Sequence, residues 1–169
     1  MLVAGLLAFV PIGLMADSGD SNTPVYLINN KSLGFQAGAL SGIGLSYQQW
    51  MGANGFQVTA GILPSYGSDI RYNVGAEYQR SIFGNNANEW LSGQLYIYGA
   101  GFHGGSIDLD SGRFDPAFGI GVGIGIETIL FSHFSIPVGL VNGIGYTPNE
   151  LTKFDFILLP QIGFRYRYK

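Results

Sequence analysis

The clearest pattern in the chain is a strict alternation of apolar and small residues between Phe118 and Leu130. The apolar side chains of one parity are Phe118, Ile120, Val122, Ile124, Ile126 and Leu130, and the other parity holds Gly119, Gly121, Gly123, Gly125 and Glu127. A period of two places these sets on opposite faces of a β-strand. A helix is disfavoured, because each interior glycine would cost about 1 kcal/mol relative to alanine. The segment is therefore predicted to be a strand with one hydrocarbon face and one nearly bare face.

The same alternation divides the chain after residue 30 into eight predicted strands. They cover residues 31–40, 43–51, 56–66, 70–83, 90–103, 118–130, 134–146 and 153–168. Short segments rich in Gly, Asn and Ser separate most of them, and the polar segment 104–113 predicts the longest loop. Residues 33–47 keep one parity and are also compatible with a single long strand. If the strands close into a barrel with both ends of the chain on the same side, their number is even, which favours the division into eight.

Composition decides which face of these strands meets lipid. Only 11% of the residues are charged, against about 25% in ordinary soluble domains, and 27 residues are glycine. Low charge, many aromatic residues and apolarity spread over alternate positions are typical of a transmembrane β-barrel. The alternative is a soluble up-and-down barrel with its apolar face inward, but that would expose the glycine row to water. We therefore predict an all-β fold, an eight-stranded antiparallel up-and-down transmembrane β-barrel.

The N-terminal segment differs from the rest of the chain. Residues 1–16 are apolar over the length of a signal-peptide core, although no Lys or Arg precedes them. The alternative is a buried first element of the mature protein, but Pro11 and Gly13 are unfavourable inside a structural helix. The sequence therefore predicts a signal peptide at 1–16, a periplasmic segment at 17–30 and a barrel domain at 31–169, located in the bacterial outer membrane.

Aromatic residues gather near the ends of the predicted strands. Those expected at the periplasmic rim are Trp50, Phe56, Phe83, Trp90, Phe131, Phe134, Phe164, Tyr166 and Tyr168. Those expected at the outer rim are Tyr66, Tyr72, Phe114, Phe118, Tyr146, Phe154 and Phe156. Two aromatic girdles flanking an apolar band are the pattern of membrane barrels.

The inward parity collects charged residues of both signs in equal number: Arg71, Glu77, Glu127, Asp155, Arg165 and Arg167. Charges in a narrow lumen require partners. Glu127 lies close to the periplasmic turn, and Arg165 and Arg167 lie near the same rim. We predict that Glu127 pairs with Arg165 or Arg167 across the lumen; the alternative is loose solvation of all three at a wet rim.

The glycine row has a predicted use inside the barrel. The interior of an eight-stranded barrel is just wide enough for side chains to interdigitate. A bare wall would leave room for larger inward residues from other strands, namely Gln94, Tyr96, Tyr98, Arg165 and Arg167. If those side chains did not fill the space, a narrow, porin-like pore would result.

Two local patterns suggest ligand binding but lack the necessary context. Residues 99–104 match G-x-G-x-x-G, yet a polar loop follows where a dinucleotide site needs a helix. Asp108 and Asp110 alternate in the next loop, without the further ligands of a calcium-binding loop. The sequence therefore predicts no cofactor and no metal.

A net charge of −3 without a basic cluster argues against nucleic acid as a partner, and the absence of cysteine excludes a disulfide scaffold.

A third pattern concerns catalysis. Residues 133–135 read His-Phe-Ser, similar to the H-x-S of lipid A deacylases, in which Glu127 or Glu150 would have to orient the histidine. That family has Asn at the next position, where this chain has Ile, and the predicted topology puts His133 in a periplasmic turn. For palmitoyl transfer, His103 is the one candidate on the outer side. We therefore predict no catalytic residues, with a lipid A-modifying enzyme as an alternative.

The chain ends in alternating apolar or aromatic and polar residues from Gln161 to Tyr168, followed by a terminal lysine. Together with the alternating strands and the glycine-rich inner face, this ending resembles small eight-stranded outer-membrane barrels of the OmpA, OmpX and opacity-protein type, over residues 31–169. The terminal lysine departs from the usual aromatic end. The resemblance implies a Gram-negative outer membrane, contact with its lipid and lipopolysaccharide, and insertion by the barrel-assembly machinery through the C-terminal strand.

The expected function is that of an integral outer-membrane protein with a structural or envelope role. A surface-interaction role is the sharper version, in which loop 104–113 contacts a host or surface ligand. A narrow pore through the glycine-lined lumen is the alternative from a different class.

Overall fold

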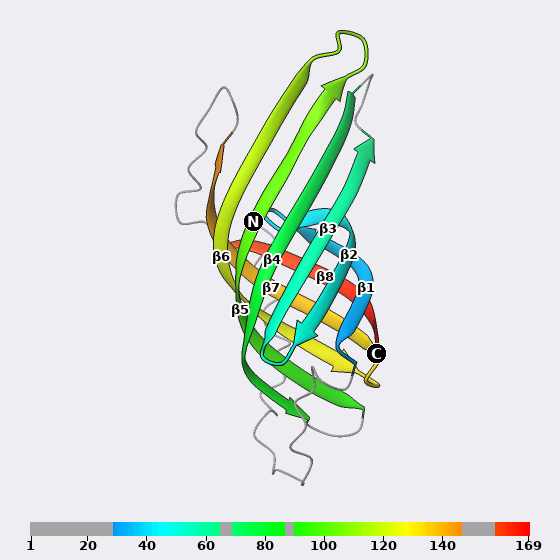
Figure 1. Cartoon of the computed structure of the whole chain (residues 1–169), viewed down its shortest axis with the longest axis vertical. Coiled ribbons are helices and arrows are strands. Elements are labelled where there is room, and N and C mark those ends of the chain that lie inside the picture. The colour runs from blue at the N-terminus through cyan, green and yellow to red at the C-terminus, as the bar shows by residue number, and fades with distance from the viewer. Residues whose placement is uncertain (1–28, 65–68, 87–89, 147–157) are drawn as a thin grey trace, which may run out of the picture.

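The computed structural model describes residues 29–64, 69–86, 90–146 and 158–169, and the statements below concern these residues. They form eight antiparallel strands in up-and-down order that close into a barrel (Figure 1). In chain order the strands are β1 (Lys31–Gly38), β2 (Gly42–Met51), β3 (Asn54–Pro64), β4 (Asp69–Asn86), β5 (Leu91–Asp108), β6 (Phe114–Leu130), β7 (Phe134–Tyr146) and β8 (Leu159–Tyr168). The predicted all-β barrel of eight strands is thus confirmed.

Barrel closure is made by the first and last strands. They pair along their whole lengths, from Lys31 opposite Tyr168 to Gly38 opposite Gln161. The stretch that was also compatible with one long strand is divided, because the chain turns between Gly38 and Gly42. The predicted signal peptide, most of segment 17–30 and the first part of the strand predicted at 153–168 lie outside the described residues.

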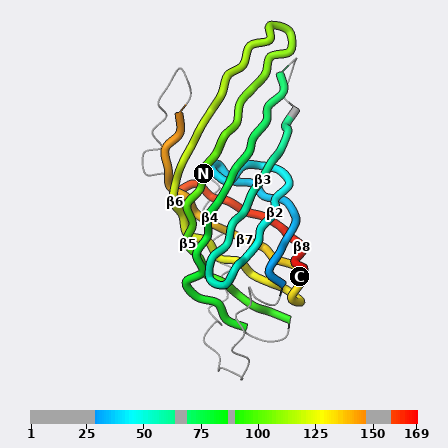
Figure 2. Tube along the Cα trace, viewed as in Figure 1, coloured from blue at the N-terminus to red at the C-terminus, as the bar shows by residue number. Residues whose placement is uncertain are grey.

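The strands differ greatly in length. β4 and β5 have 18 residues each and β6 has 17, whereas β1 has 8 and β2 and β8 have 10. Both barrel termini lie at the end of the molecule that holds the short turns at 52–53 and 131–133. At the other end, the loop end, β3 to β6 rise well beyond the turn that joins β1 to β2 (Figures 1 and 2).

The predicted ten-residue loop at 104–113 is wrong. β5 continues to Asp108 and β6 begins at Phe114, so that only the residues between them form the turn. Glycine and serine at 104–106 give no apolar signal in the sequence, yet their backbones pair in register with residues 115–117 of β6. The ladder can extend because it depends on backbone groups and not on side-chain polarity.

The barrel has inverted polarity compared with a soluble protein. On β6, Ile120 and Val122 are 63% and 70% exposed on the outer face, whereas Glu127 is fully buried inside. The orientation predicted from the alternation is therefore confirmed. Most of the buried side chains are polar, including glutamines, arginines and glutamates. No helix within the described residues is long and apolar enough to span a membrane.

The predicted aromatic girdles need one correction. Trp50 is fully buried in the lumen, with its ring 5.9 Å from that of Tyr96 in an edge-on arrangement. Trp50 lies on the same inward face of β2 as Ser46 and Gln48. The face of the strand, and not the position near the strand end, therefore determines that its side chain lies in the lumen. Among the outer aromatics are Phe83, Trp90, Phe131 and Phe164 toward the end with the termini, and Phe114, Phe118 and Tyr146 toward the loop end. Tyr66, Phe154 and Phe156 lie outside the described residues.

Candidate functional site

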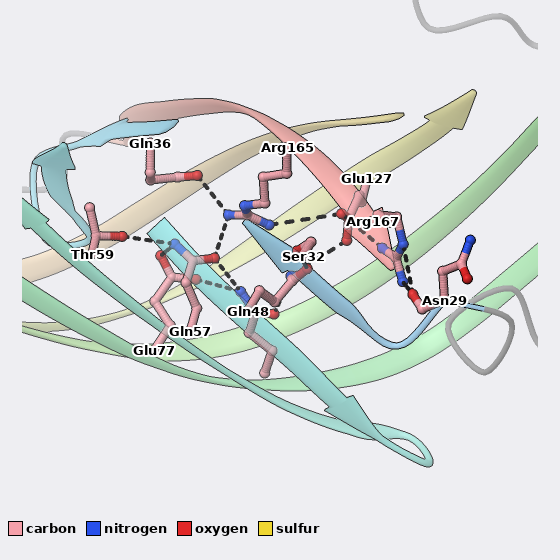
Figure 3. Close-up of polar contacts among 11 residues, drawn as sticks. Asn29, Ser32, Gln36, Gln48, Gln57, Thr59, Glu77, Glu127, Arg165 and Arg167 are labelled. Carbon is pink, nitrogen blue, oxygen red and sulfur yellow. Dashed lines mark hydrogen bonds and ion pairs between the residues drawn. The ribbon is translucent and has the colours of Figure 1, made fainter. Parts of the chain in front are cut away.

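The lumen contains a buried ion-pair cluster near the end with the termini. Glu127 projects inward from β6, and Arg165 and Arg167 project inward from β8. The Glu127 Oε1 lies 3.0 Å from Nη1 of Arg167 and 3.8 Å from Nη1 of Arg165, and the three side chains are at most 1% exposed. The pairing predicted for Glu127 is thus present (Figure 3).

Amide side chains extend this cluster to the opposite wall. Nε2 of Gln48 donates to Gln79 at 2.8 Å, and Nε2 of Gln79 donates to Glu77 at 2.7 Å. Nη2 of Arg165 donates to Gln36 at 2.7 Å and to Gln57 (Figure 3). An amide carries both a donor and an acceptor, so it can link a guanidinium on one wall to a carboxylate on another.

The predictions from sequence missed these glutamines as members of the site. Gln36, Gln48, Gln57 and Gln79 are at most 3% exposed. Each lies on the inward parity of its own strand, so the period-two pattern contained the signal. A polar residue at an inward position of a narrow barrel is buried, and a buried polar group needs a partner.

The predicted lumen charges are only partly brought together. Glu77, Glu127, Arg165 and Arg167 belong to one buried network of zero net charge. Arg71 is exposed at the loop end and does not belong to it. β4 extends past the closed part of the barrel, so an inward-facing side chain at this position meets open space and not the opposite wall. Asp155 lies outside the described residues.

The glycine row of β6 accommodates large side chains, as predicted. A Cβ at Gly123 would overlap the ring of Tyr98, and one at Gly125 would overlap the ring of Tyr96. Both tyrosines are buried, and their rings lie 5.9 Å apart. The bare wall is therefore occupied by aromatic side chains from β5.

The turn between β1 and β2 folds into the lumen and closes it above these aromatic residues. Leu40 is 2% exposed and packs against β6, where a Cβ at Gly119 would lie 2.6 Å from Leu40 Cδ2. Ser41 is fully buried, and its hydroxyl donates to Gln161 of β8. Gly42 has a φ of +82°, which returns the chain to β2, and we refer to residues 39–41 as the inward turn.

An open pocket of about 530 Å³ lies above the inward turn at the loop end. Its floor includes Gly38 and Ala39, and its sides come from β2 to β6. The side residues are Ile43, Leu63, Arg71, Tyr72, Asn73, Phe102, Gly105, Ser106, Asp115, Pro116 and Ala117. We call it the outer pocket.

The local motifs adopt structures unlike those of the sites they suggested. Residues 99–104 lie inside β5, in the interior of a continuous ladder and not in a loop before a helix. The Asp108 carboxylate accepts hydrogen bonds from the Ser111 hydroxyl at 2.6 Å and from the Asp110 and Ser111 N–H groups, which lowers the pKa of Asp108. These hydrogen bonds to the Asp108 carboxylate stabilise the hairpin turn between β5 and β6. The described residues contain no cluster of three or more His, Asp or Glu able to hold a metal ion.

The two histidines occupy outer positions. His133 is exposed in the turn before β7, with Nδ1 2.8 Å from the Phe131 carbonyl oxygen, whereas Ser135 is fully buried. Within the described chain no hydrogen bond joins His133 to Ser135, and Glu127 is engaged by the arginines. His103 lies beside Tyr72, whose hydroxyl is 3.0 Å from its Nε2. Glu150 lies outside the described residues.

Comparison with known protein families, with curated proteins and with solved structures gave no match for this chain. What the structure establishes is therefore the class defined by the fold, a small closed β-barrel of eight antiparallel strands with a filled lumen.

Proposed function

We propose that this protein is an integral outer-membrane β-barrel that acts as a non-conducting, non-catalytic scaffold of the cell envelope. The observation that carries the proposal is the inverted polarity of the barrel, with apolar side chains outside and a neutral ion-pair network inside. A continuous apolar belt around a barrel would be unfavourable in water, because soluble monomers rarely expose apolar patches beyond a few hundred Å². A lipid environment removes that cost.

The filled lumen favours a scaffold over a pore. Trp50, Tyr96 and Tyr98 form one buried aromatic cluster in the lumen, Leu40 packs against the β6 glycines on the side of the loop end, and the ion-pair cluster fills the lumen near the termini. These groups are packed from several strands at once, so opening a water path would require more than one of them to move. A planar-bilayer recording is expected to show no steady conductance.

The hairpin joining β5 and β6 is the part of the scaffold best suited to contact a surface ligand. It extends to the far loop end, where Leu109 and Phe114 are 61% and 50% exposed. Two apolar side chains at a polar hairpin tip offer a small contact surface. This supports a surface-interaction role for the segment that includes residues 104–113.

Membrane insertion is tested by a pair of matched substitutions. Val122→Arg puts a cation on the middle of the outer face of β6, where it is expected to cost about 2–4 kcal/mol in a bilayer. Leu109→Arg makes the same change at an exposed residue of the hairpin tip. We expect Val122→Arg to reduce heat-modifiable, membrane-extracted protein severely and Leu109→Arg to leave it unchanged. Equal behaviour of the two variants, or wild-type protein in the soluble fraction, would contradict the proposal.

A further inference from the structure

The outer pocket has the size and the shape of a blind binding site. Its volume of about 530 Å³ is within the range of about 300–1,000 Å³ that is usual for small-molecule sites. The inward turn closes its lower end, because Leu40 is packed against the glycines of β6. A molecule entering from the loop end could therefore be held but could not pass through the barrel.

The mouth of the pocket at the loop end has an apolar side chain at its edge. Ile43, on the outward parity of β2, lines the pocket and is 44% exposed, whereas Leu63 pairs with the inward-facing Arg71 and faces the pocket itself. Beyond the end of the β2–β3 ladder at Leu45 and Ala60, the backbone of Ile43 lies against Gly61 of β3, so the wall stays closed there. Under the proposed insertion, an alkyl chain could enter from the loop end, past the exposed apolar side chain of Ile43.

The pocket lining contains one cation and one anion, Arg71 and Asp115. Asp115 is already paired with Arg113, with Nε and Oδ2 3.1 Å apart. Arg71 also lines the pocket, and among the described residues no carboxylate forms an ion pair with it. A guanidinium that can donate two parallel hydrogen bonds is well suited to a carboxylate or phosphate group.

We infer that the outer pocket binds a single alkyl chain that carries an anionic head group. The chain lies over Ala39 and against Phe102, and the head group meets Arg71 at the rim. The same chemistry can come from a free fatty acid or from one chain of an anionic membrane lipid. This inference rests on the proposed membrane insertion, so insertion is measured separately in its test.

The test uses full-length protein refolded into phosphatidylcholine vesicles, with insertion scored by heat-modifiable migration on a gel. A dodecanoic acid analogue with a photoreactive diazirine near the chain end is added, and the labelled peptides are mapped by mass spectrometry. Labelling is expected on peptides containing Ala39 and Phe102, and excess dodecanoate should suppress it at concentrations about tenfold lower than dodecanol. Vesicles that contain phosphatidylglycerol, with no added competitor, distinguish the two sources of the ligand. If phosphatidylglycerol strongly suppresses labelling, the ligand is a membrane lipid. If it does not suppress labelling, the ligand is a free fatty acid.

Two arginines on the same strand provide the matched variants. Arg71→Ala is expected to weaken suppression by dodecanoate about tenfold, the effect of roughly one lost charge-assisted interaction. Arg80→Ala removes an exposed arginine near the opposite end of β4, where it bonds Asn54, and should leave labelling unchanged. Two results would overturn this inference while leaving the proposed function intact. One is inserted protein that is labelled only on its outer face, and the other is equal suppression of labelling by dodecanoate in the Arg71→Ala and Arg80→Ala variants. Failure to insert would overturn the proposed function itself.

Discussion

The two ends of the lumen are lined by the same inward parity but provide opposite environments. Near the termini, Glu127 and Arg167 are enclosed by all eight strands and form an ion pair at 3.0 Å. At the loop end, Arg71 of β4 is exposed beside an open pocket, because β3 to β6 extend beyond the turn that joins the short strands β1 and β2. The alternation of residues therefore determines the direction of a side chain. The lengths of the surrounding strands determine whether that side chain is buried.

The largest expected contrast comes from removing one charge at each end. Glu127→Ala leaves two buried guanidinium groups without their carboxylate, and breaking such a pair typically costs about 3–5 kcal/mol. Arg71→Ala removes an exposed charge and should change the free energy of unfolding by less than about 0.5 kcal/mol. Urea unfolding of detergent-refolded protein, followed by tryptophan fluorescence, to which the buried Trp50 contributes, measures both.

If Glu127→Ala and Arg71→Ala lower the free energy of unfolding by similar amounts, the two ends of the lumen do not differ in burial as described. Replacing all four charged residues of the network together, as Glu77→Gln with Glu127→Leu, Arg165→Met and Arg167→Met, refines the measurement. An apolar replacement of a buried ionic cluster is often neutral or stabilising, so this variant should be more stable than Glu127→Ala.

A smaller effect is expected from filling the glycine wall. A methyl group at Gly125 would overlap the ring of Tyr96, and overpacking of this kind costs about 1–3 kcal/mol. Gly101→Ala is the matched control, because a Cβ at Gly101 meets no atom within 4 Å. Both variants are compared by the same urea unfolding.

A rescue tests the cause of this loss. In a Tyr96→Leu background the added methyl group has more room, so Gly125→Ala should cost much less than it does in the wild-type protein. An undiminished cost would mean that the backbone of β6, and not the Tyr96 ring, requires glycine.

The smallest expected effect concerns the hairpin tip at low pH. Hydrogen bonds from the Ser111 hydroxyl and from the Asp110 and Ser111 N–H groups lower the pKa of Asp108 from its ordinary value of 3.8. Their contribution to local order is present above that value and is lost as the pH falls through the lowered pKa. The NMR amide signal of Ser111 should therefore be constant near neutral pH and shift only in strong acid. Asp108→Asn should abolish this titration, and a titration that persists in that variant would contradict the assignment.

Much of the barrel was predictable because period-two alternation is a direct signal of which face is buried. It predicted the closed barrel of eight strands, the outward face of β6 and the pairing of Glu127. It failed at residues 104–108, where Gly and Ser have no apolar signal although the strand continues. It also did not predict the inward turn, because three residues between strands look like any tight connection. The burial of Leu40 and Ser41 depends on β6, β7 and β8, which lie far away in the sequence.

The inward turn also has a consequence for the order of assembly. Ser41 bonds Gln161, a partner 120 residues further along the chain, and Leu40 packs against glycines of β6 and β7. The first hairpin to be synthesised therefore cannot reach its final position until the last strands have arrived. Contacts of such long sequence separation are slow to form. We expect a persistent intermediate whose paired strands still lack a sealed interior, followed by a single late step in which β8 joins β1 as the turn moves inward.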